Sequence, residues 1–203
     1  MPQSVYSHVA NASLAALLLA IVASWFVRGP MESEFAAGYL TLACTTSALA
    51  GVALLRPPPR RRDQRWWVFG LCILSITYVF GYRFDTELTE PLRLMIWGRL
   101  CLQVLANMML LSLGRSYAML PALRGVRTGL FYAWVRHPVY AVYMLADLAL
   151  VLLQPSLWNA GVASVGFAVF FLRARLEESV LDNDPVYVSY KRAVPWRFVP
   201  GVY

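Results

Sequence analysis

Hydrophobic residues gather into six long runs that short polar segments separate. In chain order the runs cover residues 9–27, 36–55, 66–82, 92–113, 139–153 and 156–172. A helix needs about 20 apolar residues, and at least roughly 17, to cross the hydrocarbon core of a bilayer. The first four runs reach that length, whereas the last two are shorter and only Gln154 and Pro155 separate them. We therefore predict an all-α, multi-pass transmembrane helix bundle of about six spans, with the last two forming a tight hairpin, followed by a cytoplasmic C-terminal segment.

The composition agrees with a membrane protein. Hydrophobic residues make up 59% of the chain and charged residues only 14%, whereas a soluble domain carries roughly a quarter charged residues. The three cysteines, Cys44, Cys72 and Cys101, all lie within predicted spans, so neither disulfide nor zinc spacing is present and we expect no metal. No internal repeat is evident, and the chain is interpreted as one integral-membrane domain, 1–203.

The basic residues predict the orientation in the membrane. Fourteen of the eighteen Lys and Arg residues lie in the segments 56–65, 114–137 and 173–203, while acidic residues outnumber basic ones in 28–35 and 83–93. Cytoplasmic loops are enriched in Lys and Arg, so both termini and the three basic segments are expected on the cytoplasmic side. The net charge of +7 is explained by this interleaving with spans, and no nucleic-acid partner is expected. Abundant arginine and alanine favour a prokaryotic cytoplasmic membrane.

Two charged clusters flank the predicted hairpin. Arg136 and His137 precede Pro138, and proline is favoured at the first position of a helix. Both residues should therefore lie at a helix N-terminus, where free N–H groups attract anions. Glu177 and Glu178 follow the next apolar run, where the chain returns to the same side. The hairpin should thus assemble a site for a charged ligand at the membrane face.

Polar side chains also lie within the spans. Arg99 and Gln103 are spaced by one helical turn in the fourth span, and Asp147 shares a face with Tyr140 in the fifth. Charged residues at bilayer depth cost about 2.5–3.5 kcal/mol on insertion scales and are usually paired and functional. Arg99, Gln103 and Asp147 are therefore candidate substrate residues. An ion pair between Arg99 and Asp147 that only holds two helices together is an equally good interpretation.

The stretch from Leu113 to Pro200 resembles the isoprenylcysteine carboxyl methyltransferase family, within a wider group that includes phospholipid methyltransferases. The matching pieces are 113–116, Gly129, the run 136–140, Arg173 with Glu177 and Glu178, Tyr187, Tyr190 and the closing stretch 194–200. The resemblance implies that 113–203 forms a methyltransferase-like catalytic core after four spans in 1–112. Asp147 departs from the family, which is ordinarily apolar there.

The resemblance implies S-adenosyl-L-methionine as the cofactor. Arg136 and His137 suit its carboxylate, and Glu177 or Glu178 suits its ammonium or ribose hydroxyls. A flat slot for the adenine is expected from four aromatic residues, Tyr132, Trp134, Tyr140 and Tyr190, whose ring faces also tolerate the sulfonium. No Gly-rich Rossmann turn is present, which excludes the fold of soluble methyltransferases.

Arg173 matches the family's arginine and is the candidate catalytic residue, because a planar guanidinium can hold a carboxylate acceptor bidentately. The alternative for Arg173 is a simple i, i+4 ion pair with Glu177. The predicted function is carboxyl O-methylation of a lipophilic, isoprenoid-like small molecule or lipidated acceptor, whose tail stays in the lipid bilayer. One alternative is a phospholipid or small-molecule N- or S-methyltransferase. A second is a non-enzymatic membrane transporter or structural protein.

Overall fold

The computed structural model describes residues 3–28, 36–55, 59–63, 65–83 and 90–202. Within these ranges the chain is mostly helical, its two strands are two residues long, and loops connect the elements, so the predicted all-α class is confirmed. The elements are α1 (Gln3–Arg28), α2 (Ala36–Leu55), β1 (Arg61–Arg62), α3 (Trp66–Thr77), η2 (Tyr78–Gly81), α4 (Glu90–Leu113), η3 (Gly114–Ser116), β2 (Ala122–Leu123), η4 (Leu130–Ala133), α5 (Pro138–Leu153), α6 (Leu157–Leu181) and α7 (Pro185–Ala193).

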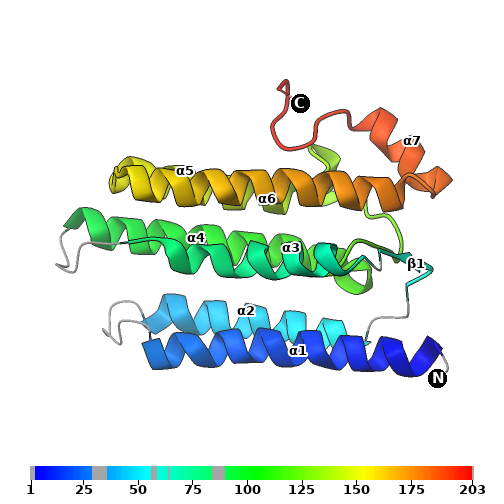
Figure 1. The fold of residues 1–203 in the computed structure, drawn as a ribbon, viewed down its shortest axis with the longest axis horizontal. Helices are drawn as coiled ribbons and strands as arrows, with labels where there is room; N and C mark the ends of the chain where they lie inside the picture. The colour runs from blue at the N-terminus through cyan, green and yellow to red at the C-terminus, as the bar shows by residue number, and fades with distance from the viewer. Residues whose placement is uncertain (1–2, 29–35, 56–58, 64, 84–89, 203) are drawn as a thin grey trace.

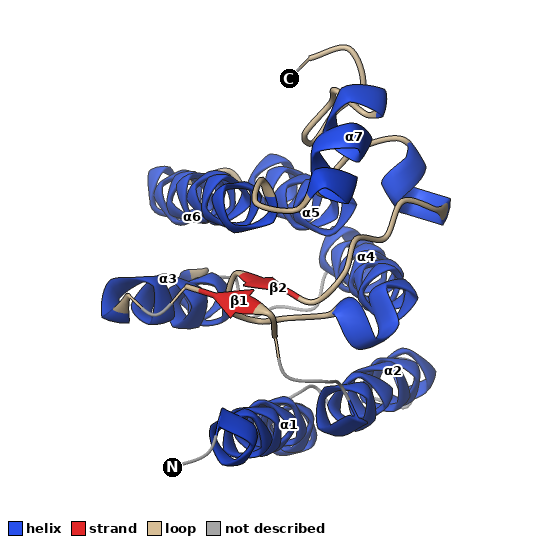
Figure 2. Ribbon diagram, turned by 90° about the vertical axis from the view of Figure 1, so that its right-hand side faces the viewer, coloured by secondary structure: helices blue, strands red, loops and turns tan. Residues whose placement is uncertain are grey.

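The long helices form three stacked layers of two helices each. Figure 1 shows α1 beside α2, α3 at the same level as α4, and α5 beside α6, with their axes nearly parallel in the view. The end view in Figure 2 shows the same three pairs, with α7 and the C-terminal segment beyond the α5–α6 layer. The layers follow the order of the helices along the chain. The last layer, α5 and α6, belongs to the segment 113–203 that resembles a methyltransferase core.

Three of the helices are long and apolar enough to cross a membrane: Ala36–Leu55, Arg93–Ser116 and Leu157–Leu181. Three shorter apolar helices cover Asn11–Ala23, Trp66–Gly81 and Pro138–Leu153. All six coincide with the hydrophobic runs found in the sequence. Helix α6 continues to Leu181, nine residues beyond the predicted end of the last run, so Arg173 and both glutamates lie on the helix itself.

A short antiparallel ladder joins two of the basic segments. β1 pairs with β2, so that Arg61 lies opposite Leu123 and Arg62 opposite Ala122. Additional backbone bonds run from Arg60 N–H to the Leu123 carbonyl and from Asp63 N–H to the Pro121 carbonyl, both at 2.9 Å. The ladder lies at the end of the bundle where α7 and the described N-terminus also lie (Figure 1). The described parts of the segments 56–65, 114–137 and 173–203 therefore meet at one end of the helices.

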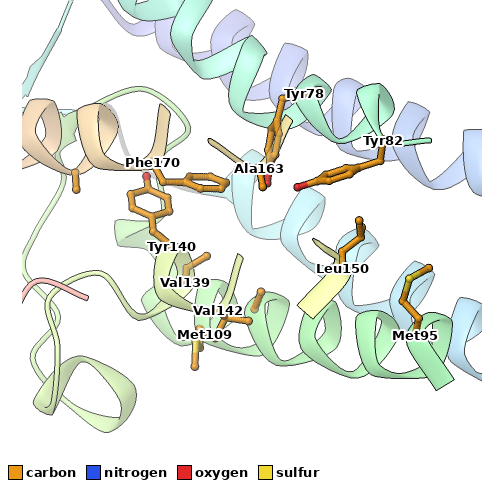
Figure 3. Packing of buried hydrophobic residues seen from close by; sticks show 12 residues of the cluster. Tyr78, Tyr82, Met95, Met109, Val139, Tyr140, Val142, Leu150, Ala163 and Phe170 are labelled. Atoms are coloured by element: carbon orange, nitrogen blue, oxygen red, sulfur yellow. The ribbon is translucent and has the colours of Figure 1, made fainter. Parts of the chain in front are cut away.

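The largest hydrophobic core lies between η2, α4, α5 and α6, and aromatic rings dominate its centre (Figure 3). Phe170 stacks on Tyr140 and Tyr143, with ring centroids 5.3 and 5.4 Å apart, and meets Tyr78 edge-on at 5.7 Å. Gly166 permits this close approach, because a Cβ there would stand 2.5 Å from the Tyr78 ring. The packed rings fix α5 against α6 and so set the positions of the polar residues near their ends.

Candidate active site

Helix α5 begins at Pro138 with His137 at the N-cap position, as the sequence predicted. The backbone N–H groups of Arg136 and His137 donate to the carbonyl oxygens of Trp196 and Arg197, at 3.0 and 2.9 Å. The side chains of Arg136 and His137 are both buried. The C-terminal segment therefore packs against the start of α5 and encloses the two basic side chains.

Glu178 is the centre of a buried cluster of charges. Its carboxylate accepts from Arg136 Nε at 3.0 Å and from Arg197 Nε and Nη2 at 3.0 and 2.7 Å, and His137 Nε2 lies 3.1 Å away. Arg136 Nη1 also donates to the carbonyl oxygens of residues 194–195. Because Glu178 is only 3% exposed, this cluster ties α6 to α5 and to the C-terminal segment.

Glu177, the neighbouring residue, has a different environment. Its carboxylate accepts a hydrogen bond from the Tyr140 hydroxyl, and it lies 3.5 Å from Arg173 Nη2 and 3.8 Å from His137 Nδ1. Its side chain is 22% exposed, against 4% for that of Glu178. The His137 ring stacks on the Tyr140 ring with an interplanar angle of 4°. Glu177 thus keeps a carboxylate that is held in place and still accessible.

A cavity of about 130 Å³ lies at this point. Six of the seven residues predicted to bind the cofactor line it, namely Tyr132, Arg136, His137, Tyr140, Glu177 and Tyr190. The seventh, Glu178, is not among the lining residues, because its carboxylate is enclosed by its basic partners. The structure adds two lining tyrosines, Tyr117 and Tyr187. Tyr187 belongs to the motif found in the sequence, whereas no sequence pattern marked Tyr117.

Tyr190 on α7 and Tyr132 in η4 are neutral hydrogen-bond donors. The Tyr190 hydroxyl donates to the backbone carbonyl of Tyr132 at 2.7 Å. Burial raises the pKa of Tyr190 to about 12 and that of Tyr132 well above its usual value of 10. Both hydroxyls therefore stay protonated at neutral pH, and the rings present flat surfaces without added negative charge.

A second cavity, of about 290 Å³, lies deeper among the helices and is about twice as large as the first. It is lined by all four residues predicted for the acceptor: Arg99, Gln103, Asp147 and Arg173. Tyr140 and Val139 line both cavities. The residues predicted for the cofactor and those predicted for the acceptor therefore line two neighbouring cavities, which share a wall at the start of α5.

Asp147 is buried, and its carboxylate accepts a hydrogen bond from the Tyr78 hydroxyl at 2.7 Å. Among the described residues, no ion pair joins Arg99 to Asp147, so the structural pairing considered from sequence does not form as a direct contact. Gln103 instead donates to Asn107 at 3.3 Å and to Tyr143 at 3.4 Å.

Arg173 is held by groups from three parts of the chain. Its Nη1 donates to Ser75 Oγ at 2.5 Å and its Nη2 to the Met119 carbonyl at 2.7 Å. The i, i+4 contact with Glu177, at 3.5 Å, is also present. Within the described part of the chain, Nε of Arg173 has no hydrogen-bond partner, although the side chain is buried. Arg173 thus lies at a fixed position, and its Nε–H remains without a partner among the described residues.

Comparison with known proteins gives one match. The model of the isoprenylcysteine carboxyl methyltransferase (ICMT) family matches residues 94–183. The matched range contains the whole of α5 and α6 and ten of the eleven residues predicted for the site, all but Tyr190. No curated protein and no solved structure matches the chain.

Proposed function

We propose that this chain is an integral-membrane, S-adenosyl-L-methionine-dependent carboxyl methyltransferase of the isoprenylcysteine carboxyl methyltransferase family, whose model matches residues 94–183. The observation that carries the proposal is the pair of adjoining cavities with Tyr140 in their common wall. One is lined by an accessible carboxylate and tyrosine rings, and the other by Arg173 and apolar helix surfaces. A zwitterionic cofactor and a lipophilic acid acceptor suit these two linings.

The residues of the first cavity fit the cofactor by their chemistry. Glu177 is a carboxylate that suits an ammonium group or ribose hydroxyls, and the buried rings of Tyr132 and Tyr190 suit an adenine. When bound, S-adenosyl-L-methionine supplies an electrophilic methyl group. Arg136 holds the C-terminal segment through Glu178 and backbone carbonyls, so we assign it a supporting role at this cavity rather than a direct contact.

In the second cavity Arg173 would align the acceptor. A carboxylate is already ionised at neutral pH, so the reaction needs orientation and exclusion of water but no general base. Proximity and orientation alone can lower a barrier by roughly 7–11 kcal/mol. The bonds of Arg173 to Ser75 and Met119 fix its guanidinium, and Nε remains to donate to the acceptor.

Replacing Arg173 by lysine tests this role. The substitution keeps the charge but removes the planar fork and the bonds that orient it. We expect cofactor affinity within about twofold of wild type and kcat reduced at least tenfold, which corresponds to about 1.4 kcal/mol of transition-state stabilisation. The assay uses labelled S-adenosyl-L-methionine and N-acetyl-S-farnesylcysteine, an acceptor of the class named by the family.

The pH profile of the same assay separates acceptor chemistries. A carboxylate acceptor is ionised throughout the range from about pH 6 to 8, so the rate should be flat there. An amine acceptor must lose a proton, and its rate should rise with pH. A steep rise in activity on a phospholipid amine, together with an indifferent Arg173→Lys, would instead establish the N-methyltransferase alternative.

We further propose six membrane spans with both termini cytoplasmic, since the three basic segments meet at one end of the bundle. Single cysteines at Thr86 and Ser189, in a protein whose Cys44, Cys72 and Cys101 are replaced by alanine, should be labelled from opposite faces of the membrane. Thr86 lies outside the described residues, whereas Ser189 is exposed on α7. Labelling of both positions from the same face would contradict the topology.

A further inference from the structure

We propose that the second cavity selects an acceptor with two polar ends, in which a hydrogen-bond-accepting oxygen binds Arg99 about 10 Å from the carboxylate that is methylated. The inference rests on the proposed function and adds a substrate class to it. A simple hydrocarbon-tailed acid has only one polar end, so the two classes of acceptor are chemically distinct.

The donor at the far end of the cavity is Arg99. Its Nη1 atom is buried and has no hydrogen-bond partner among the described residues. The residue lies within a helix that is long and apolar enough to span a membrane. An unsatisfied buried donor costs about 1–3 kcal/mol, and more when it is charged. An oxygen from the acceptor would remove this cost when it binds.

The neighbouring polar groups already have partners. Asp147 accepts from Tyr78, and Figure 3 shows the Tyr82 hydroxyl directed toward that of Tyr78. Gln103 is bonded to Asn107 and Tyr143. Among the described residues, Asp147 forms no direct ion pair with Arg99, so it does not bind the guanidinium. At this end of the cavity, the described donor without a partner is a guanidinium N–H of Arg99. The ligand group that best completes the site is therefore a hydrogen-bond acceptor.

The separation of the two ends follows from α5. Tyr140 lies at the reaction end, where its ring stands 5.4 Å from the Arg173 guanidinium. Asp147 lies seven residues later, about 10 Å along the helix at 1.5 Å per residue. Arg99 acts electrostatically on Asp147 and belongs to the same end. Between the ends the wall includes the apolar side chains of Leu102 and Phe170 and the polar side chains of Gln103 and Tyr143, which are bonded to each other.

This arrangement should discriminate between acceptors. A site with a buried donor rejects an analogue that lacks the matching oxygen, because the donor then stays unpaired. Hydrogen bonds to charged groups contribute about 1.5–3 kcal/mol, or about ten- to hundredfold in affinity. An extended chain of eight to ten carbons covers about 10 Å at ordinary bond lengths, so ten-carbon acids are suitable probes.

The experiment compares decanoic, 10-hydroxydecanoic and decanedioic acids by calorimetry on the purified full-length protein in detergent, with titrations into protein-free micelles subtracted. We expect at least one of the two oxygen-terminated acids to bind at least tenfold more tightly than decanoic acid. Arg99→Met should abolish the preference. Arg93→Met, on the same helix but outside both cavities, should retain it.

Equal affinities of all three acids for the wild-type protein, or no binding of any, would overturn the inference whether or not Arg99→Met folds. A preference that survives in Arg99→Met would also overturn it. Binding of S-adenosyl-L-methionine is measured on the same preparation. Cofactor binding without a preference among the acids leaves the proposed function standing and overturns this inference. A preference among the acids without cofactor binding supports the two-ended binding site and contradicts the proposed methyl transfer.

Discussion

Glu178→Gln is expected to lower the free energy of unfolding by about 3–5 kcal/mol, the usual cost of removing one partner from a buried ion pair. The substitution preserves the shape of the side chain but leaves the guanidinium groups of Arg136 and Arg197 without their carboxylate. Because Arg197 lies in the C-terminal segment, that segment should also detach from α5. Unfolding in mixed micelles measures the first effect, and proteolysis of the C-terminal segment measures the second.

Glu177→Gln is the matched control, since it makes the same chemical change one residue earlier on the same helix. Glu177 is more exposed and lies 3.5 Å from its arginine, so its loss should cost no more than about 1 kcal/mol of stability. Equal destabilisation by the two substitutions would contradict the structural role assigned to Glu178.

The second large effect is expected on cofactor affinity. Glu177→Gln should weaken binding of S-adenosyl-L-methionine about ten- to hundredfold, as the loss of a charge-assisted hydrogen bond of about 1.5–3 kcal/mol implies. Calorimetry on the folded, monodisperse variant measures it. His137→Ala should weaken binding as well, but His137 also contacts Glu178, so its effect includes a loss of stability. Wild-type affinity in Glu177→Gln would remove that residue from the cofactor site.

Local sequence patterns predicted the helices and the relation between residues on one helix. The start of α5 at Pro138 and the one-turn contact of Arg173 with Glu177 both follow from short-range rules. The hydrophobic run marks only the apolar part of α6, because the run stops at Leu172 while the helix continues through charged residues to Leu181. Contacts of those residues with the C-terminal segment stabilise the polar end of the helix.

The different environments of Glu177, which is accessible, and Glu178, which is enclosed, were not predictable from sequence. Both follow the same apolar run, and the packing of residues 136, 137 and 197 against α6 decides which carboxylate is enclosed. The same holds for Arg173 with Ser75, 98 residues apart, and for Asp147 with Tyr78, 69 residues apart. Such pairs depend on the register between packed helices, which a hydrophobic pattern along one helix does not determine.

Methyl transfer by the purified wild-type protein in lipid nanodiscs tests whether this chain is a carboxyl methyltransferase. The protein is incubated with methyl-labelled S-adenosyl-L-methionine and, in separate reactions, with N-acetyl-S-farnesylcysteine, 10-hydroxydecanoic acid or decanedioic acid, and the lipophilic product is treated with base. An ester releases its label as methanol, whereas an N-methyl group stays attached. We expect base-labile label that requires active protein, and the amount transferred should fall at least tenfold in Arg173→Lys. Base-stable label, or no transfer to any acid although the protein is folded, would contradict it.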